Sequence, residues 1–155
     1  MTDFSDLLAP TTVIEGLVAK TRKALFAEIG VALAAAHGLD ADAVTLALSE
    51  REKLGSTGFG GGVAIPHGRL AGLGQVTGLF ARLAQPIDFE AVDALPVDLV
   101  FAMVSPPDAG AEHLKALARV SRRLRDQAFV AKLRGAGSTD ALYALWTHDH
   151  ARDAA

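Results

Sequence analysis

Residues 51–68 of this 155-residue chain read REKLGSTGFGGGVAIPHG, a glycine-rich stretch that runs into a short apolar segment and a histidine. Five glycines lie between Gly55 and Gly62, so this part is expected to be a loop whose backbone N–H groups can approach an anion. It is not a P-loop, because a Walker sequence ends in Gly-Lys-Ser/Thr at the start of a helix. Here the loop leads into Val63-Ala64-Ile65, and Pro66 stops that run, so the run is expected to be the end of a strand.

The histidine of this stretch, His67, lies between Pro66 and Gly68. Proline fixes its own φ and lacks a backbone donor, and Gly68 is expected to leave room beside the imidazole. A stiff backbone with an open flank suits a reactive side chain. A histidine in an ordinary turn fits the same residues, so the local sequence alone leaves both interpretations open.

Helical patterns precede the stretch. A helix is expected from Thr21, its N-cap, to about His37, with Gly38 as its stop. Its core face is marked at i, i+4 and i+8 by Leu25, Ile29 and Leu33. A second helix is expected from a cap at Asp40 to about Lys53.

Strand patterns follow it. Val76–Ala84 and Val97–Val104 are the two best strand candidates, and Thr11–Ile14 is a shorter one. The run from Leu99 to Val104 is almost wholly apolar, as expected for a strand covered on both faces. The more polar segment Gln85–Pro96 is expected to be turn-like. Further helices are expected at about 111–125, 127–133 and 139–147, the last capped by Thr139, so the order of elements favours a layered α/β domain.

Two polar residues continue apolar helical stripes. In the second helix a stripe at i, i+3 and i+4 is formed by Val44, Ala47 and Leu48. Arg51 continues it at i+7, and a guanidinium on a core-facing edge needs an anion or a carbonyl as partner. In the third helix a stripe is formed by Leu117, Val120 and Leu124. His113 precedes this stripe by one turn and is expected on the buried side, although an ordinary hydrogen-bonded histidine and a snorkelling arginine fit these positions too.

Composition excludes several classes of function. The net charge is −3 and no basic cluster is interleaved with aromatics, so no nucleic-acid partner is expected. The chain has no cysteine, so a covalent intermediate must form on another side chain. A zinc site from His67 and His113 lacks a third ligand, so no metal is expected. The start of the chain does not resemble a signal peptide and no apolar run is long enough to span a membrane, so a soluble, cytoplasmic protein is expected.

Together with four further blocks, residues 51–68 resemble the type 2 enzyme IIA domain of the bacterial phosphoenolpyruvate-dependent phosphotransferase system (PTS), most of all its nitrogen-type members. The blocks are Leu7-Leu8-Ala9-Pro10 with Val13-Ile14, Pro86-Ile87-Asp88-Phe89, Pro96-Val97-Asp98-Leu99-Val100-Phe101 and Glu112-His113-Leu114. The resemblance implies a single α/β domain, residues 4–147, with a mixed β-sheet flanked by helices, and a frayed tail, residues 148–155.

The resemblance also implies the roles of individual residues. His67 is implied to be the phosphoryl acceptor, His113 to stabilise the phosphoryl group beside it, and Arg51 to neutralise its charge. Ser56 and Thr57 match the loop that lies near the phosphoryl group. Relatives often carry a polar residue between two glycines where this chain has Gly60-Gly61-Gly62, so a side-chain contact is absent at that position.

The resemblance leaves three functions open. The first is a nitrogen-type phosphocarrier that takes phosphate from an HPr-like phosphohistidine protein. It then regulates targets such as kinases, transporters or their regulators. The second is a fructose- or mannitol-type IIA protein that passes phosphate to the cysteine of a separate IIB domain. The third is a binding module that is never phosphorylated. None of the three requires a cofactor.

Overall fold

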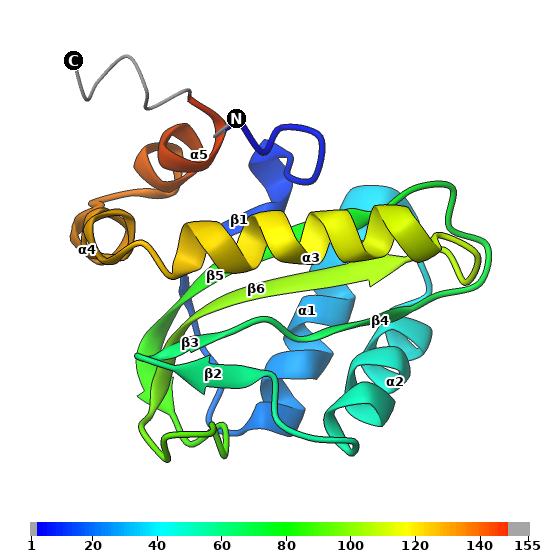
Figure 1. Cartoon of the computed structure of the whole chain (residues 1–155), viewed down its shortest axis with the longest axis horizontal. Coiled ribbons are helices and arrows are strands. Elements are labelled where there is room, and N and C mark those ends of the chain that lie inside the picture. Colours follow the sequence, from blue (N-terminus) through cyan, green and yellow to red (C-terminus); the bar gives the residue numbers. More distant parts are fainter. Residues whose placement is uncertain (1–2, 149–155) are drawn as a thin grey trace.

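The computed structural model describes residues 3–148, and across this range the chain forms an α/β fold around one mixed sheet. The strands of the sheet run in the order β1-β5-β6-β3-β2, and β4 also pairs with β6 (Figure 1). Pairing is antiparallel in β5/β6 and β2/β3 and parallel in β1/β5, β3/β6 and β4/β6. The strands are β1 Val13–Leu17, β2 Gly58–Gly60, β3 Val63–Ala64, β4 His67–Arg69, β5 Thr77–Ile87 and β6 Val97–Ser105.

The helices begin where short polar side chains can accept hydrogen bonds from the first turn. Thr21 caps α1 (Arg22–His37), Asp40 caps α2 (Ala41–Glu52), and α1 ends at Gly38 in the left-handed region, all as predicted. The third helix, α3 (Gly110–Leu124), starts directly after the loop that follows β6. The last two helices are α4 (Gln127–Gly135) and α5 (Thr139–Thr147).

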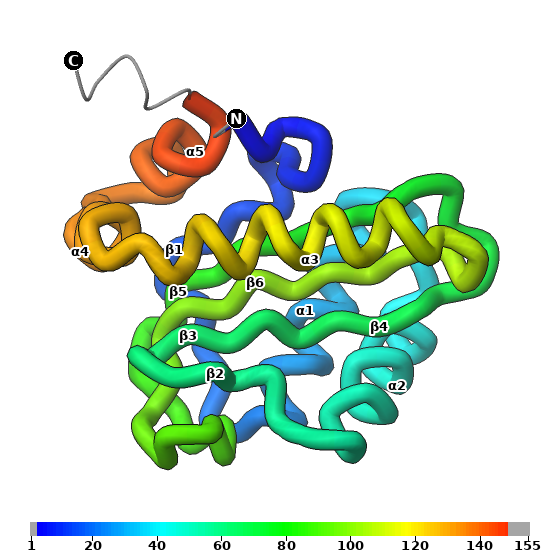
Figure 2. The backbone as a smooth tube through the Cα atoms, viewed as in Figure 1, coloured from blue at the N-terminus to red at the C-terminus, as the bar shows by residue number. Residues whose placement is uncertain are grey.

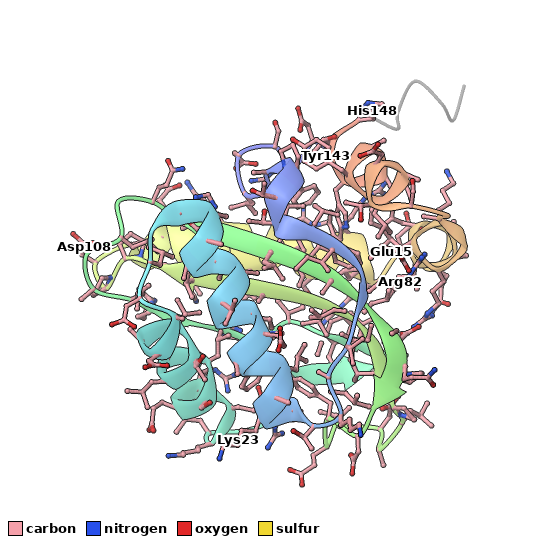
Figure 3. All side chains as sticks on the ribbon, turned by 180° about the vertical axis from the view of Figure 1, so that it is seen from behind. Glu15, Lys23, Arg82, Asp108, Tyr143 and His148 are labelled. Carbon is pink, nitrogen blue, oxygen red and sulfur yellow. The ribbon has the colours of Figure 1, made fainter. Side chains whose placement is uncertain are left out.

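Each face of the sheet packs against its own layer of helices. On β6, alternate residues belong to two different apolar clusters, as period-2 side-chain directions require. Leu99, Phe101 and Met103 pack with α3, α4 and α5, and Val100, Ala102 and Val104 pack with α1 and α2. Figure 3 shows α1 and α2 covering the face opposite to α3. The predicted strand with both faces covered is therefore confirmed.

The N-terminal segment closes the α3–α5 side of the fold. The Phe4 N–H donates to the Trp146 carbonyl at 2.9 Å, which joins the first described residues to α5 (Figure 2). The Trp146 ring has no exposed surface and packs edge-on or tilted against four phenylalanine rings, Phe4, Phe80, Phe101 and Phe129. The two ends of the described chain thus share one aromatic core.

Several local predictions were wrong. Ser138, not Thr139, caps α5, because the Ser138 hydroxyl accepts from the Ala141 N–H at 3.1 Å. The first strand starts only at Val13, since the Thr12 side chain exchanges hydrogen bonds with the Ala9 backbone in a short 3₁₀ turn, η1 (Pro10–Thr12). The end of β5 extends two residues past Gln85 into the segment expected to be turn-like.

Residues 51–68 contain one unexpected strand and the start of another. Gly58–Gly60 was expected to be loop but forms β2, and His67 was expected after a strand end but begins β4. Strand β4 runs parallel to β6, with His67 opposite Met103. Both strands are only three residues long and glycine-containing, so neither shows the apolar alternation of an ordinary strand.

The place that a side chain at Gly68 would take is occupied by α2. A Cβ at Gly68 would lie 2.8 Å from the Ala47 carbonyl oxygen of α2. Glycine is therefore needed here because the helix backbone lies directly on the strand. This close approach brings the C-terminal half of α2 against the strand that begins with His67.

Most of the tail expected to be frayed, residues 149–155, lies outside the described part of the chain. Within residues 3–148, no helix combines the length and apolar character that crossing a bilayer requires.

Candidate functional site

An open groove between α2, β4 and the first turn of α3 contains three of the five side chains that the sequence singled out. The α2 side contributes apolar residues together with Glu50 and Arg51, and β4 and α3 contribute the other titratable side chains. The lining includes Leu46, Arg51, Leu54, His67, Arg69 and His113. Leu46 and Leu54 are largely exposed, so the groove has an apolar rim beside its polar floor.

The His67 ring is held in one tautomer by the backbone. Its Nδ1 lies 2.8 Å from the Ile65 carbonyl oxygen. A carbonyl oxygen can only accept, so Nδ1 carries the proton and the neutral ring has its lone pair on Nε2. Burial lowers the pKa of His67 below its ordinary value of 6.5, the bond to Ile65 opposes this, and the charge of Arg51 lowers the pKa further. His67 is therefore a neutral imidazole with a free Nε2 at pH 7.

His113 lies beside His67, and its side chain is buried as predicted. The two ring centroids are 5.5 Å apart and the ring planes are inclined by 54°. His113 Nδ1 lies 2.7 Å from the hydroxyl of Ser105, the last residue of β6. Burial, together with the charges of Arg69 and His67, lowers the pKa of His113 to about 4. The second ring of the pair is therefore also neutral at pH 7.

Two arginines supply positive charge to the groove. Arg51 is half-buried, and its Nη1 donates to the Gly55 carbonyl at 2.9 Å, so it has the carbonyl partner that the stripe pattern required. Arg69 lies two residues after His67 on β4, and its Nη1 reaches the Pro106 and Pro107 carbonyls at 3.4 and 3.3 Å. Both guanidiniums keep further N–H groups that can donate to an anion in the groove.

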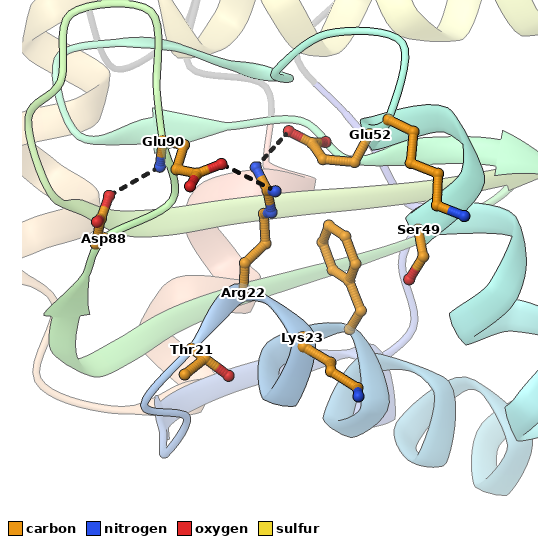
Figure 4. Close-up of a pocket in the computed structure, with 9 residues that line it drawn as sticks. Thr21, Arg22, Lys23, Ser49, Glu52, Asp88 and Glu90 are labelled. Carbon is orange, nitrogen blue, oxygen red and sulfur yellow. Dashed lines mark hydrogen bonds and ion pairs between the residues drawn. The ribbon is translucent and has the colours of Figure 1, made fainter.

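The side chains of Ser56 and Thr57 are not among those that line the groove. The buried Thr57 hydroxyl donates to Glu52 Oε1 at 2.6 Å and its N–H donates to Oε2 at 2.9 Å. The Ser56 hydroxyl accepts from the Gly58 N–H at 3.1 Å. Arg22 approaches Glu52 at 3.5 Å from α1, inside a second pocket shown in Figure 4. The hydroxyls of this loop therefore stabilise its own conformation.

Backbone hydrogen bonds connect Thr57, which is held by Glu52, to His67. The Thr57 carbonyl accepts from the Ile65 N–H at 3.0 Å, and the Ile65 carbonyl accepts from His67. Glu52 is only 6% exposed, so this chain of hydrogen bonds starts at a buried carboxylate with two donors and a nearby cation. The glycine-rich loop thus fixes the strand end that holds the imidazole.

The sequence profile of the family described as phosphoenolpyruvate-dependent sugar phosphotransferase system, EIIA 2, matches residues 6–148. The chain belongs to this family. It is 48% identical over 141 residues to the nitrogen regulatory protein of Bradyrhizobium diazoefficiens, an alignment that covers 91% of this chain and 92% of that protein. The resemblance found in the sequence is confirmed.

Solved structures agree with this IIA assignment. The crystal structure of nitrogen regulatory protein IIA-Ntr from Neisseria meningitidis matches with a TM-score of 0.86 at 37% identity, covering 92% of this chain and 97% of that one. The Escherichia coli mannitol IIA enzyme, solved in complex with phosphorylated IIB, matches with a TM-score of 0.71 at 21% identity, covering 90% and 96%. The second match shows the fold alone. This IIA protein is therefore of the nitrogen type, and the mannitol type is more distant.

Three residues that shape the site of this IIA protein were missed in the sequence. Glu52 lies at i+8 from Val44, and with Leu48 at i+4 these three are the buried residues of α2, so the stripe pattern could have found it. Arg69 follows His67 at i+2, a signal that becomes visible only once β4 is known to be a strand. Ser105 directly follows the apolar run Leu99–Val104. This position indicates the end of a strand and gives no sign of the contact with His113.

No group of three or more His, Asp or Glu side chains within residues 3–148 is arranged to hold a metal ion. The polar groups that line the site of this IIA protein are two neutral imidazoles, the guanidiniums of Arg51 and Arg69 and the carboxylate of Glu50, which pairs with Lys53.

The two histidines are expected to titrate below the ordinary value of 6.5, with His113 changing charge near pH 4. The unfolded chain binds a proton at each position near pH 6.5 and the folded chain does so only at lower pH. Folding stability from this source is therefore complete above pH 6.5 and is lost as the pH falls from 6.5 toward 4. Ring C–H chemical shifts between pH 3.5 and 8, with urea unfolding at pH 7 and pH 5, measure both effects. Titration of His113 at or above 6.5 would contradict the expected shift.

Proposed function

We propose that this nitrogen-type IIA protein accepts a phosphoryl group on Nε2 of His67 from the phosphohistidine of an HPr-like carrier. Its phosphorylation state then regulates its binding to target proteins. The observation that carries the proposal is the hydrogen bond from His67 Nδ1 to the Ile65 carbonyl. It leaves the lone pair of Nε2 free on a ring that lines a groove between two arginines and a second histidine.

The transfer exchanges one P–N bond for another. The lone pair of His67 Nε2 attacks phosphorus, the P–N bond of the carrier's phosphohistidine breaks, and its electron pair returns to the carrier's ring nitrogen. The proton on His67 Nδ1 stays on the bond to Ile65, so the phosphorylated ring bears a positive charge. When the P–N bond of this positively charged ring breaks, the ring leaves as neutral imidazole, a good leaving group, and the phosphoryl group therefore stays transferable.

Positioning and charge do most of the work in a loose phosphoryl-transfer transition state. We propose that Arg51 neutralises the equatorial oxygens and that His113 donates to one of them. Ser56 and Thr57 support this role indirectly, because their hydroxyls brace the loop next to Arg51 and Ile65. The domain that does this is proposed to comprise residues 4–147.

Phosphorylation would change the groove mainly in charge. A phosphoryl group brings about two negative charges to a place where Arg51 and Arg69 are the nearby cations. Leu46 and Leu54 at the rim are 60% and 84% exposed, so a partner can combine apolar contact with a response to this charge. The proposed partners are the HPr-like carrier and regulated proteins such as kinases, transporters or their regulators, all met in the cytoplasm.

The test is reconstitution with enzyme I, an HPr-like carrier and ³²P-labelled phosphoenolpyruvate. We expect close to one acid-labile, base-stable phosphate per chain, because phosphoramidates hydrolyse in acid and phosphoserine does not. Omission of the carrier is the control and should reduce labelling to background. No labelling, or an acid-stable product, would overturn the proposal and would favour a binding module that is never phosphorylated.

A second arm of the same experiment addresses the sugar-uptake alternative. Labelled protein is mixed with a fructose- or mannitol-type IIB domain, and phosphate on the IIB cysteine is measured. We expect the label to stay on this chain, because the chain is more similar to nitrogen regulatory proteins than to the mannitol IIA enzyme solved with phosphorylated IIB. Transfer to IIB as fast as the loading from the carrier would favour the alternative.

A further inference from the structure

The last residue of β6, Ser105, has a side chain with no exposed surface. Its hydroxyl oxygen lies 2.7 Å from Nδ1 of His113, and its backbone carbonyl accepts from the Leu70 N–H at 2.8 Å. Ser105 also lies opposite Arg69 in the parallel pairing of β4 with β6. It is thus fixed on both sides, by the sheet and by the ring of His113.

The direction of the Ser105–His113 hydrogen bond follows from counting protons. Within residues 3–148 the Ser105 hydroxyl has no other hydrogen-bond partner than His113, and burial keeps water away from it. If His113 Nδ1 carried a proton, the hydroxyl would accept it and the serine's own proton would be left buried and unpaired, which is costly. If the serine donates to a bare Nδ1, both groups are satisfied. The second arrangement is therefore favoured.

A bare Nδ1 on a neutral ring places the proton of His113 on Nε2. The neighbouring His67 is held the other way round, with its proton on Nδ1 at the Ile65 carbonyl and its lone pair on Nε2. The two rings, 5.5 Å apart, are thus held in opposite tautomers by two different partners. One ring presents a nucleophile to the groove and the other presents a donor.

We propose that Ser105 is a positioning residue that holds His113 in the Nε2–H tautomer. His113 then faces the phosphoryl group on His67 as a neutral hydrogen-bond donor. The tautomer of His113 is inferred from the Ser105 contact alone. Its consequence, donation to the phosphoryl group, rests on the proposed function. Ser105 touches neither phosphate nor carrier and acts only through the ring of His113.

The experiment reads the tautomer and the transfer rate separately. Long-range ¹H–¹⁵N correlation spectra of ¹⁵N-labelled protein distinguish a bare ring nitrogen from a protonated one. In the wild type at pH 7 we expect His113 with bare Nδ1 and protonated Nε2, and His67 with the reverse. In Ser105→Ala we expect a mixture of tautomers at His113. Single-turnover loading from the carrier should fall about tenfold, the factor that one ordinary hydrogen bond supports.

Two further variants separate positioning from general loss of stability. Ser105→Thr keeps a hydroxyl and should restore both the tautomer and the loading rate. Thr12→Val removes another fully buried hydroxyl, one that bonds the Ala9 backbone, and should lower stability without changing either readout.

A protonated Nδ1 at His113 in the wild type would overturn the proposal, and that spectrum decides the matter even if a Ser105 variant does not fold. An unchanged loading rate in a folded Ser105→Ala protein would also overturn it. Absence of any labelling in the wild type, with the tautomers as expected, would instead defeat the proposed function.

Discussion

Replacing His67 with alanine is expected to abolish phosphoryl transfer, lowering loading from the carrier by about 10⁴-fold or more. The chain has no cysteine to substitute as nucleophile. His113 is a poor replacement, because its Nδ1 is already engaged by Ser105 and burial lowers its pKa to about 4. The assay is single-turnover labelling from a ³²P-phosphorylated HPr-like carrier.

Folding of the His67→Ala protein should be little affected. The half-buried ring makes one hydrogen bond, to Ile65, so the free energy of unfolding should fall by only about 1 kcal/mol. His37→Ala is a matched control, because it removes an exposed histidine at the end of α1 and should load normally. Acid-labile phosphate that persists in His67→Ala at the wild-type rate would show that the acceptor is a different residue.

Replacing His113 with alanine is expected to slow phosphoryl transfer by about 10²- to 10³-fold, as loss of a preorganised donor to developing charge does elsewhere. The effect should fall mainly on the rate at saturating carrier, because His113 is proposed to act at the phosphoryl group and not in docking. Stability should also fall, by about 1–3 kcal/mol, since the Ser105 hydroxyl loses its partner. Transfer should nevertheless suffer more than folding.

Leu117→Ala provides the comparison for that claim. Leu117 is a partly buried residue of the same helix that packs on the aromatic core and does not line the groove. Its loss should lower the melting temperature to a similar degree and leave the loading rate near that of the wild type. Normal transfer in His113→Ala together with a large loss of thermal stability would assign His113 to the core instead.

Local chemistry made much of the fold predictable. Helix ends depend on local interactions. The side chains of Thr21 and Asp40 bond to the first turn of their helices, and Gly38 adopts the left-handed conformation that ends α1, so each can be recognised from neighbouring residues alone. The apolar run that forms β6 likewise predicts, from its composition alone, a strand that is buried on both faces. Fold class and family followed from such signals and from the resemblance of residues 51–68.

What the sequence did not predict depends on distant partners. β4 is a strand only because it lies beside β6, and Gly68 is needed only because Ala47 of α2 lies on it. The contact between Ser105 and His113 likewise arises from a turn between two elements and has no periodic signature. The sequence therefore indicated His67, His113 and Arg51, whereas the partners that fix the two tautomers became visible only in three dimensions.

The tight contact between α2 and β4 bears on how a partner could distinguish the two forms of the protein. Because the Ala47 carbonyl of α2 lies against Gly68 of β4, the helix that carries the exposed Leu46 and the strand that begins with His67, the proposed acceptor, keep a fixed position relative to each other. Under the proposed function, a phosphoryl group on His67 leaves the outline of the surface almost unchanged and makes the charge of the groove less positive. A partner would then distinguish the two forms by the charge of a rigid surface. Because salt screens exposed charges, the difference in affinity between the two forms should become smaller as the ionic strength rises.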